Sequence, residues 1–254
     1  MMLHVTKLVA ALSAGGVLAL STFAHADQEA GIPAALERLT INGQQLTPGS
    51  VRPAPIEGPL YEIRLKNGET FYSDAQGRHM VVGTLYDNAP EGLVNLTEQG
   101  ERTHRLAQLE QLSRNDLVIF PASGDEQAVI TVFTDTTCPY CQMLHQEIGQ
   151  LNAAGVTVHY VPFPRAGRGS PAAQQLAQVM CSEDPRAAMS AAFEGQTLTE
   201  TPSEGCLASV DEGYRLGQQF GVQGTPSIVL PSGEMGEGYV PVEQLVQAIG
   251  RPSS

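Results

Sequence analysis

The spacing of apolar and polar positions changes its period along the chain. Residues 61–65 alternate strictly between apolar and charged side chains, and this period of two predicts a half-buried β-strand. Turn signals at 67–68 and 74–77 extend that strand into a small antiparallel meander whose last strand covers 80–86. The last strand is uncharged, so its edge is exposed unless a second copy of the chain covers it.

Two helices are predicted on either side of the meander. Before it, the run AALERLTI places Ala34, Leu36 and Leu39 on one face of a short helix. After it, a polar boundary with Pro and Gly at 87–95 leads into a helix over 97–112, whose leucines form one stripe among charged residues. This second helix fits a connector between domains, and it equally fits a surface helix packed on one neighbour.

From Leu117 onward the pattern is that of an α/β domain. The apolar run AVITVFT at 128–134 predicts a buried strand, 142–155 a helix and 156–163 the next strand, which together form a βαβ unit. Two further helices flank a looser segment that holds Cys206. A strand PSIVL, a Pro-Ser-Gly turn and a final helix complete the domain.

The first residues have the pattern of a cleavable export signal. Lys7 supplies a positive start, Leu8 to Phe23 an apolar or small-residue core, and Ala24 to Ala26 a small-residue cleavage site. The apolar stretch is short and rich in Gly and Ser, which disfavours a membrane anchor. We expect a mature chain that begins at Asp27, is exported and is not stably inserted in a membrane.

Charge and length narrow the possible classes of protein. The formal net charge is −13, and removing residues 1–26 takes away one lysine and no acid, so the mature chain carries −13 − 1 = −14. Nucleic acid is therefore not expected as a partner. About 228 residues remain, enough for one large or two modest domains.

Cysteine chemistry is confined to the second half of the mature chain, at Cys138, Cys141, Cys181 and Cys206. The first two form a C-x-x-C motif where a buried strand gives way to a helix, with Pro139 suited to the first helical position. Backbone N–H groups and the helix dipole at such an N-terminus lower a thiol pKa from about 8.5 to between roughly 3.5 and 7.5. The motif predicts thiol–disulfide exchange, with Cys141 the less exposed of the pair.

Two other uses of the pair are weaker. A zinc site needs a second close-spaced pair, but Cys181 and Cys206 stand 25 positions apart, and neither a metal nor another cofactor is expected. A purely structural disulfide between Cys138 and Cys141 would stabilise the fold little, because a loop of three residues hardly constrains an unfolded chain. Cys181 and Cys206 fit a structural disulfide, since nothing around them is electropositive enough to activate a thiol.

Two residues near this chemistry have more than one interpretation on sequence alone. Pro226, after Thr225, opens a strand, where proline is tolerated in trans and is less commonly cis. His145 lies one helical turn after Cys141 and is either a contact of the pair or an ordinary packed or solvated histidine.

Several segments together resemble the DsbC/DsbG family of periplasmic protein disulfide isomerases. They are VITVFTDTTCPYCQMLH around the pair, HYVPFPRAG, GVQGTPSIVL followed by GYVPVEQL, the two separate cysteines, and GRHMVVGTLYD upstream. The resemblance covers nearly all of the mature chain and is much more specific than a lone C-x-x-C motif.

The resemblance implies an α+β architecture. After a signal peptide at 1–26 it places a cystatin-like dimerisation domain at 27–90, a linker helix at 91–116 and a thioredoxin-fold domain with a helical insertion at 117–254. In the family, two protomers form a V-shaped homodimer whose apolar cleft holds misfolded proteins.

Residue by residue, the resemblance implies that Cys138 is the exposed nucleophile and Cys141 the resolving thiol. It implies that Pro226 is cis and faces the pair, and that the backbone of Thr225 holds a substrate strand. It also implies that the remaining two cysteines form the structural bridge.

The dipeptide between the reactive cysteines departs from the best-known isomerases of this type. Pro139-Tyr140, which we place with Thr225 and Pro226 at the substrate-binding face, stands where those enzymes carry Gly-Tyr; Pro-Tyr occurs in the DsbG branch and in glutaredoxins. This dipeptide tunes thiol pKa and redox poise, so it bears on substrate preference. The short linker favours the DsbC side.

The implied function is periplasmic thiol:disulfide interchange, which isomerises and reduces incorrect disulfides in secreted proteins, together with chaperone activity. A membrane reductant of the DsbD kind is implied, because such a pair works only when it is kept reduced. Two alternatives stay open: a DsbG-like reductase of sulfenylated single cysteines, and a mainly non-enzymatic chaperone.

Overall fold

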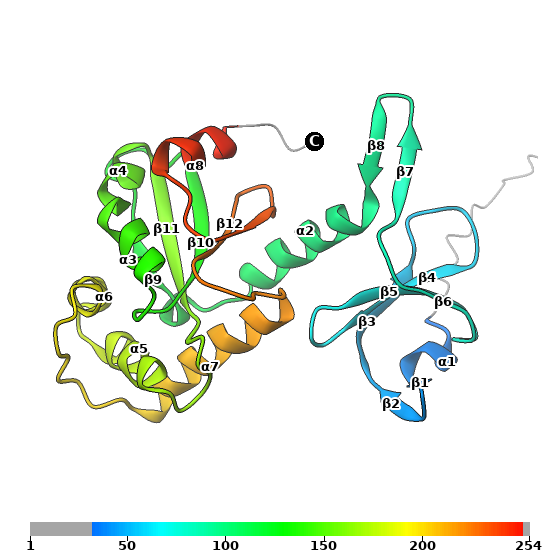
Figure 1. The fold of residues 1–254 in the computed structure, drawn as a ribbon, viewed down its shortest axis with the longest axis horizontal. Coiled ribbons are helices and arrows are strands. Elements are labelled where there is room, and N and C mark those ends of the chain that lie inside the picture. The colour runs from blue at the N-terminus through cyan, green and yellow to red at the C-terminus, as the bar shows by residue number, and fades with distance from the viewer. Residues whose placement is uncertain (1–31, 251–254) are drawn as a thin grey trace, which may run out of the picture. The chain divides into compact units, whose positions relative to one another are not determined.

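The structure is a computed structural model that describes residues 32–250 (Figure 1). Its N-terminal part combines a short helix with small antiparallel sheets. The elements are α1 (Ala34–Glu37), β1 (Leu39–Ile41) paired with β2 (Gln44–Leu46), a sheet of β3 (Pro48–Pro53), β4 (Leu60–Leu65), β5 (Thr70–Asp74) and β6 (Met80–Val81), and a hairpin of β7 (Tyr86–Ala89) and β8 (Gly92–Asn95). The predicted export signal lies outside the described residues.

The predicted meander is present, with three differences. An additional strand, β3, pairs with β4; its prolines and a bulge between Pro48 and Ser50 hide it from pattern analysis. The third strand stops at Val81, ahead of Gly83, whose φ of 154° favours glycine. The expected boundary after it forms the β7–β8 hairpin, closed at Gly92 with a φ of 134°.

The helix predicted over 34–39 is also shorter than expected. It ends at Glu37, and Leu39 lies in β1 instead. Leu36 and Leu39 still share one buried cluster with Ile63 and Phe71 of the sheet, whereas Ala34, predicted on the same face, is exposed. A short helix of this kind is stabilised by that packing and not by its own length.

Helix α2 (Leu96–Leu109) follows the hairpin. It begins after Asn95, whose side chain accepts a hydrogen bond from the Glu98 N–H at 2.9 Å, as N-cap asparagines do. One turn later, Glu101 accepts hydrogen bonds from Arg64 and from Thr70, the latter at 2.8 Å. The helix is therefore tied to the four-stranded sheet from its first turns.

The C-terminal part is an α/β domain built on one mixed sheet with helices beside it (Figure 1). The strand order is β13-β12-β10-β11-β9, in which only β10 and β11 are parallel. The strands are β9 (Val118–Phe120), β10 (Ala128–Thr134), β11 (Val156–Pro162), β12 (Ser227–Val229) and β13 (Met235–Glu237). The helices are α3 (Pro139–Gln146), α4 (Ile148–Ala153), α5 (Pro171–Cys181), α6 (Pro185–Phe193), α7 (Glu204–Gln219) and α8 (Val242–Ile249).

The βαβ unit, the last predicted strand and the final helix are where the sequence placed them. The crossover helix is interrupted at Glu147, which divides it into α3 and α4. The looser segment is more ordered than expected: α6 occupies part of it, and Cys206 lies in the first turn of α7. Strand β13 was missed, because its residues Met235–Glu237 are half-buried to exposed and carry no alternation.

Small residues let α7 approach the sheet. A Cβ on Gly213 would lie 2.4 Å from the Pro162 carbonyl oxygen, and one on Gly217 would lie 2.3 Å from the ring of Phe163. Such distances exclude any side chain larger than hydrogen without movement of the backbone. The end of β11 and the loop after it are thereby held against α7.

Within residues 32–250, no helix has the length and apolar character needed to cross a membrane.

Candidate active site

The site begins where strand β10 runs out. Thr134 ends the strand, and a tight turn leads to Cys138, whose N–H donates to the Asp135 carbonyl at 3.0 Å. The buried Asp135 carboxylate accepts from the Thr137 N–H at 2.8 Å and from the Thr137 hydroxyl at 2.7 Å. These bonds fix the path of the chain into α3 and so fix where Cys138 sits.

An ion pair between the buried Asp135 and the exposed Arg165 supports this turn. Arg165, in the loop after β11, donates through its Nε to Asp135 at 3.2 Å, and its backbone N–H donates to the same oxygen at 2.9 Å. Burial alone would raise the pKa of Asp135, but the hydrogen bonds from Thr137 and Arg165 outweigh it and lower that pKa. The carboxylate is therefore charged at neutral pH, and Arg165 keeps a positive charge beside the cysteine pair.

Cys138 caps the N-terminus of α3, as predicted from the position of Pro139. It is not exposed, however: its relative exposure is 1%. The thiol donates to the Thr225 carbonyl oxygen at 3.1 Å, so the loop before β12 lies against it. The resemblance implied an exposed nucleophile, and the structure instead places the sulfur just below exposed neighbours, among them Tyr140 at 58%.

The pKa of Cys138 is lowered. Burial acts to raise it, but the nearby Thr225 side chain, Cys141 and the Tyr140 N–H, which favour the thiolate, have the larger combined effect. The backbone donors belong to the first turn of α3, which is the stabilisation expected for an anion at a helix N-terminus.

Cys141 behaves in the opposite way. It is completely buried, and burial raises its pKa to about 11 against the lowering effect of the Asp135 N–H and of the nearby Thr134 and Thr225 side chains. The pKa values of two thiols three positions apart are therefore shifted in opposite directions, down for Cys138 and up for Cys141, so Cys138 forms a thiolate more readily.

The Thr225–Pro226 peptide bond is cis, and both residues are buried. Sheet register brings them to the pair, because β12 lies antiparallel beside β10 with Ser227 opposite Phe133. Ser227 is itself buried and donates to the Gly224 carbonyl oxygen at 2.8 Å, which closes the turn ahead of Thr225. Residues 87 positions apart in sequence thus meet at Cys138.

His145 does not form a hydrogen bond with either cysteine. Its two ring nitrogens lie 3.2 Å from the Tyr160 hydroxyl and 2.9 Å from the Ser190 hydroxyl, and its ring packs against Phe193 with centroids 4.6 Å apart. Burial lowers its pKa to about 4. This is the packed-histidine interpretation of the sequence, with the helical insertion (α5 and α6) as the packing partner.

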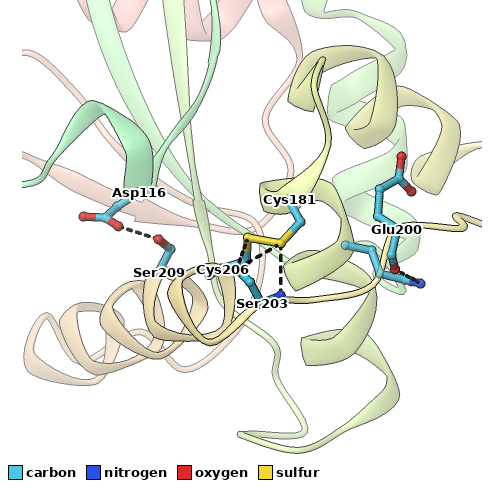
Figure 2. Close-up of a disulfide and its surroundings, with 7 residues drawn as sticks. Asp116, Cys181, Glu200, Ser203, Cys206 and Ser209 are labelled. Carbon is cyan, nitrogen blue, oxygen red and sulfur yellow. Dashed lines mark hydrogen bonds between the residues drawn. A yellow bond between two sulfur atoms is a disulfide. The ribbon is translucent and has the colours of Figure 1, made fainter.

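The other two cysteines are joined (Figure 2). Cys181 ends α5 and Cys206 begins α7, with a Cα–Cα distance of 5.6 Å. Ser203, the N-cap of α7, donates its backbone N–H to the Cys181 sulfur at 3.2 Å. Ser209 on the same helix donates to Asp116 at 2.6 Å. The bridge and these bonds anchor the start of α7.

Across residues 32–250, no cluster of three His, Cys, Asp or Glu side chains is arranged to hold a metal ion.

Comparison with known proteins places this site in a family. One family model, described as the disulfide bond isomerase protein N-terminal domain, matches residues 22–98, and a thioredoxin-like domain model matches 114–251. The thiol:disulfide interchange protein DsbC of Dickeya dadantii (strain 3937) is 35% identical over 229 residues, 90% of this chain and 89% of that protein. The chain belongs to the DsbC family. DsbC of Escherichia coli (strain K12) is 34% identical over 227 residues, 89% of each chain.

DsbC proteins are periplasmic thiol:disulfide interchange proteins, and this member is a disulfide isomerase and oxidoreductase that acts on substrate proteins. The expected α+β fold with a thioredoxin-like domain is confirmed. A linker-deletion mutant of Proteus mirabilis ScsC has a TM-score of 0.52 and 21% identity, and the match covers 60% of this chain and 82% of that one. This likeness concerns the fold alone.

Sequence analysis missed three residues of this DsbC site. Asp135 and Arg165 stand in the quoted segments FTDTTC and PFPRAG, and an acid and a base flanking the motif were the available signal. Thr134 gave no signal, because a threonine at the end of a buried strand is ordinary.

Proposed function

We propose that Cys138 is the nucleophile and Cys141 the resolving thiol of this isomerase. The observation that supports it is the opposite direction of their pKa shifts: lowered at the helix N-terminus for Cys138, raised by burial for Cys141. A nucleophile must be a thiolate at working pH, whereas a resolving thiol that stays protonated leaves the mixed disulfide time to rearrange.

The chemistry proceeds in balanced steps. The Cys138 thiolate attacks a substrate disulfide, forms a mixed disulfide and releases one substrate thiolate. In isomerisation another substrate thiolate attacks the mixed disulfide, forms a new substrate disulfide and releases Cys138 with no net electron transfer. In reduction Cys141 loses its proton and attacks Cys138; a Cys138–Cys141 disulfide forms, and the substrate keeps both electrons as a second thiolate.

Substrate backbone binds at Thr225 and Pro226, next to Pro139 and Tyr140. The Thr225 carbonyl oxygen accepts a hydrogen bond from the protonated Cys138 thiol at 3.1 Å. It loses that donor when Cys138 becomes a thiolate or enters a mixed disulfide, and it is then available to a substrate N–H. Tyr140 stands exposed beside it and offers an apolar ring to the incoming chain.

The reduction branch leaves the pair oxidised, so a reductant of the DsbD kind at the membrane returns it to the dithiol form. The functional unit is a homodimer joined through the domain at 27–90, with 91–116 as linker and 117–254 as catalytic domain. The uncharged edge at β6, with Val81 59% exposed, supports this pairing. Residues 1–26 direct export and are removed from the exported chain.

Reactivation of a scrambled multi-disulfide ribonuclease in a glutathione buffer tests the assignment. The wild-type protein and a Cys141→Ser variant should both restore activity, the variant in part, because isomerisation needs only Cys138. Cys138→Ser should restore none. If Cys138→Ser retains activity, or if Cys141→Ser behaves as the sole inactive variant, the two roles are wrongly assigned.

A second activity, reduction of a sulfenylated single cysteine, is supported by the Pro139-Tyr140 dipeptide shared with the DsbG branch. Competition between a protein with one sulfenic acid and the scrambled ribonuclease discriminates the two activities. Faster reduction of the sulfenate identifies that branch. A Cys138→Ala protein that still suppresses aggregation in full would identify chaperone binding as the main activity.

A further inference from the structure

Two buried hydroxyl groups at the cysteine pair lack a hydrogen-bond partner. Among residues 32–250 four buried side-chain polar atoms are in this position, and two of them are the hydroxyl oxygens of Thr134 and Thr225. Thr134 is completely buried and Thr225 is 7% exposed. A buried hydroxyl without a partner is destabilising, so a native structure that keeps one needs a physical reason for it.

The backbone of Thr134 does not account for its presence. Thr134 closes β10, lies opposite Pro162 of β11 and accepts a hydrogen bond from the Phe163 N–H at 2.8 Å. Valine would satisfy the same strand position with the same shape and without the unpaired polar group. Only the hydroxyl distinguishes threonine from valine at this site.

Thr134 and Cys141 are both completely buried, on either side of the turn that leads into α3. The Thr134 side chain acts to lower the pKa of Cys141 against the larger effect of burial, although its hydroxyl makes no hydrogen bond in this structure. The two threonines differ in which cysteine they affect. Thr225 acts on the pKa of both cysteines, whereas Thr134 is among the principal influences on Cys141 alone.

We propose that the Thr134 hydroxyl donates a hydrogen bond to the Cys141 sulfur whenever that sulfur carries negative charge, and thereby sets how quickly Cys141 ends an encounter with substrate. The inference rests on the proposed roles of the two cysteines. Charge reaches Cys141 when it loses its proton to attack Cys138 in the mixed disulfide, and again when a reductant thiolate attacks Cys138 and expels Cys141 as a thiolate. A donor in place before the charge arrives stabilises it without rearrangement.

The hydroxyl therefore controls the partition between two outcomes. Faster resolution by Cys141 gives net reduction, and slower resolution leaves the mixed disulfide open to substrate thiols, which is isomerisation. Loss of the hydroxyl is expected to slow the first path and to leave the attack by Cys138 unchanged. Thr134 is thus a determinant of the reductase share of the activity.

Single-turnover kinetics of Thr134→Val with a disulfide-bonded peptide, quenched by acid and followed by mass spectrometry, test this. The mixed disulfide should persist about 10-fold longer or more than in the wild-type protein, since a hydrogen bond to a charged group is lost. The pH at which resolution accelerates should move upward, and the rate of mixed-disulfide formation should be unchanged. Thr134→Ser, which keeps the hydroxyl, should resolve at close to the wild-type rate.

Thr131→Val is the matched control, because Thr131 is also buried in β10 and alternation turns its side chain to the opposite face. It should resolve at the wild-type rate. The proposal is overturned if Thr134→Val resolves as fast as wild type, or if Thr131→Val slows resolution equally. Failure of the underlying cysteine roles has a different signature: a mixed disulfide that forms through Cys141, or one that forms in Cys138→Ser.

Discussion

Individual residues give the two thiols different chemistry although they share one turn of helix. Cys138 has backbone N–H donors around it, whereas Cys141 is surrounded mostly by the apolar interior. The pKa-raising effect of burial therefore prevails only for Cys141. The positions of both cysteines and the helix N-terminus were predictable from C-P-Y-C after an apolar run. The burial of Cys138 was not, because it depends on the Thr225 carbonyl, which a distant segment supplies.

At this scale, the half-buried His145 predicts how the stability of the protein changes in acid. Burial lowers the pKa of His145 to about 4 from 6.5, so the unfolded chain binds the proton more readily between those values. Its contribution to the free energy of unfolding is present above pH 6.5 and is lost as the pH falls toward 4. Allowing for the partial solvent access of His145, we expect the free energy of unfolding to fall by about 2 kcal/mol over this pH range.

Urea denaturation of wild-type protein and His145→Gln at a series of pH values measures this loss. Glutamine keeps a hydrogen-bonding group beside Tyr160 and Ser190 and does not titrate, so the variant should lose less stability than wild type between pH 6.5 and 4. His79, exposed and paired with Asp74, offers His79→Gln as a control that leaves this difference in place. Parallel pH curves for wild type and His145→Gln would contradict the account.

At the scale of elements, apolar periodicity predicted the parts with strong patterns. Strand Leu60–Leu65 alternates, strand Ala128–Thr134 is a continuous apolar run and helix Val242–Ile249 has a helical repeat, and all three were found. Strand β3 was missed because Pro48 and Pro53 weaken a pattern that only pairing with β4 completes. A partner strand is a tertiary feature, and local sequence carries little of it.

The link between α2 and the four-stranded sheet is testable at this scale. Glu101 accepts from Arg64, which is 5% exposed, and from Thr70 at 2.8 Å. Glu101→Gln removes the nearer of two carboxylates beside a buried guanidinium, the other being Glu62 at 3.8 Å, and we expect it to lower the free energy of unfolding by about 3 kcal/mol. The exposed pair of Glu212 and Arg215 supplies the control Glu212→Gln, expected to cost less than about 1 kcal/mol. Equal effects of the two substitutions in chemical denaturation would show that burial of Arg64 carries no special cost.

For the whole molecule, family membership joins an N-terminal domain without cysteines to a catalytic domain that holds all four. Val81 at the end of the edge strand β6 and Val82 directly after it, 59% and 82% exposed, are the surface proposed for pairing with a second copy. The uncharged character of this edge was visible in the sequence. Its exposure in the single chain was expected from the sequence as well, whereas the end of the strand at Val81 was not.

A charged substitution at this edge tests the dimer. Val81→Lys should shift the mature protein from dimer to monomer in light scattering after size exclusion, because a lysine on each edge opposes strand pairing. Met143→Lys, an exposed apolar position on α3, should leave the mass unchanged. A wild-type protein that is monomeric at micromolar concentration, or a Val81→Lys protein that stays dimeric, would contradict pairing through β6.

The central claim is that one helix N-terminus separates the two thiols into a nucleophile and a resolving group. The most direct measurement is the pH dependence of alkylation of each cysteine in the reduced protein, read by mass spectrometry of the two singly substituted variants Cys141→Ser and Cys138→Ser. The account predicts that Cys138 reacts with a pKa clearly below its ordinary value of 9.0 and that Cys141 titrates near 11. A Cys141 that titrates at or below the pKa of Cys138 would contradict it.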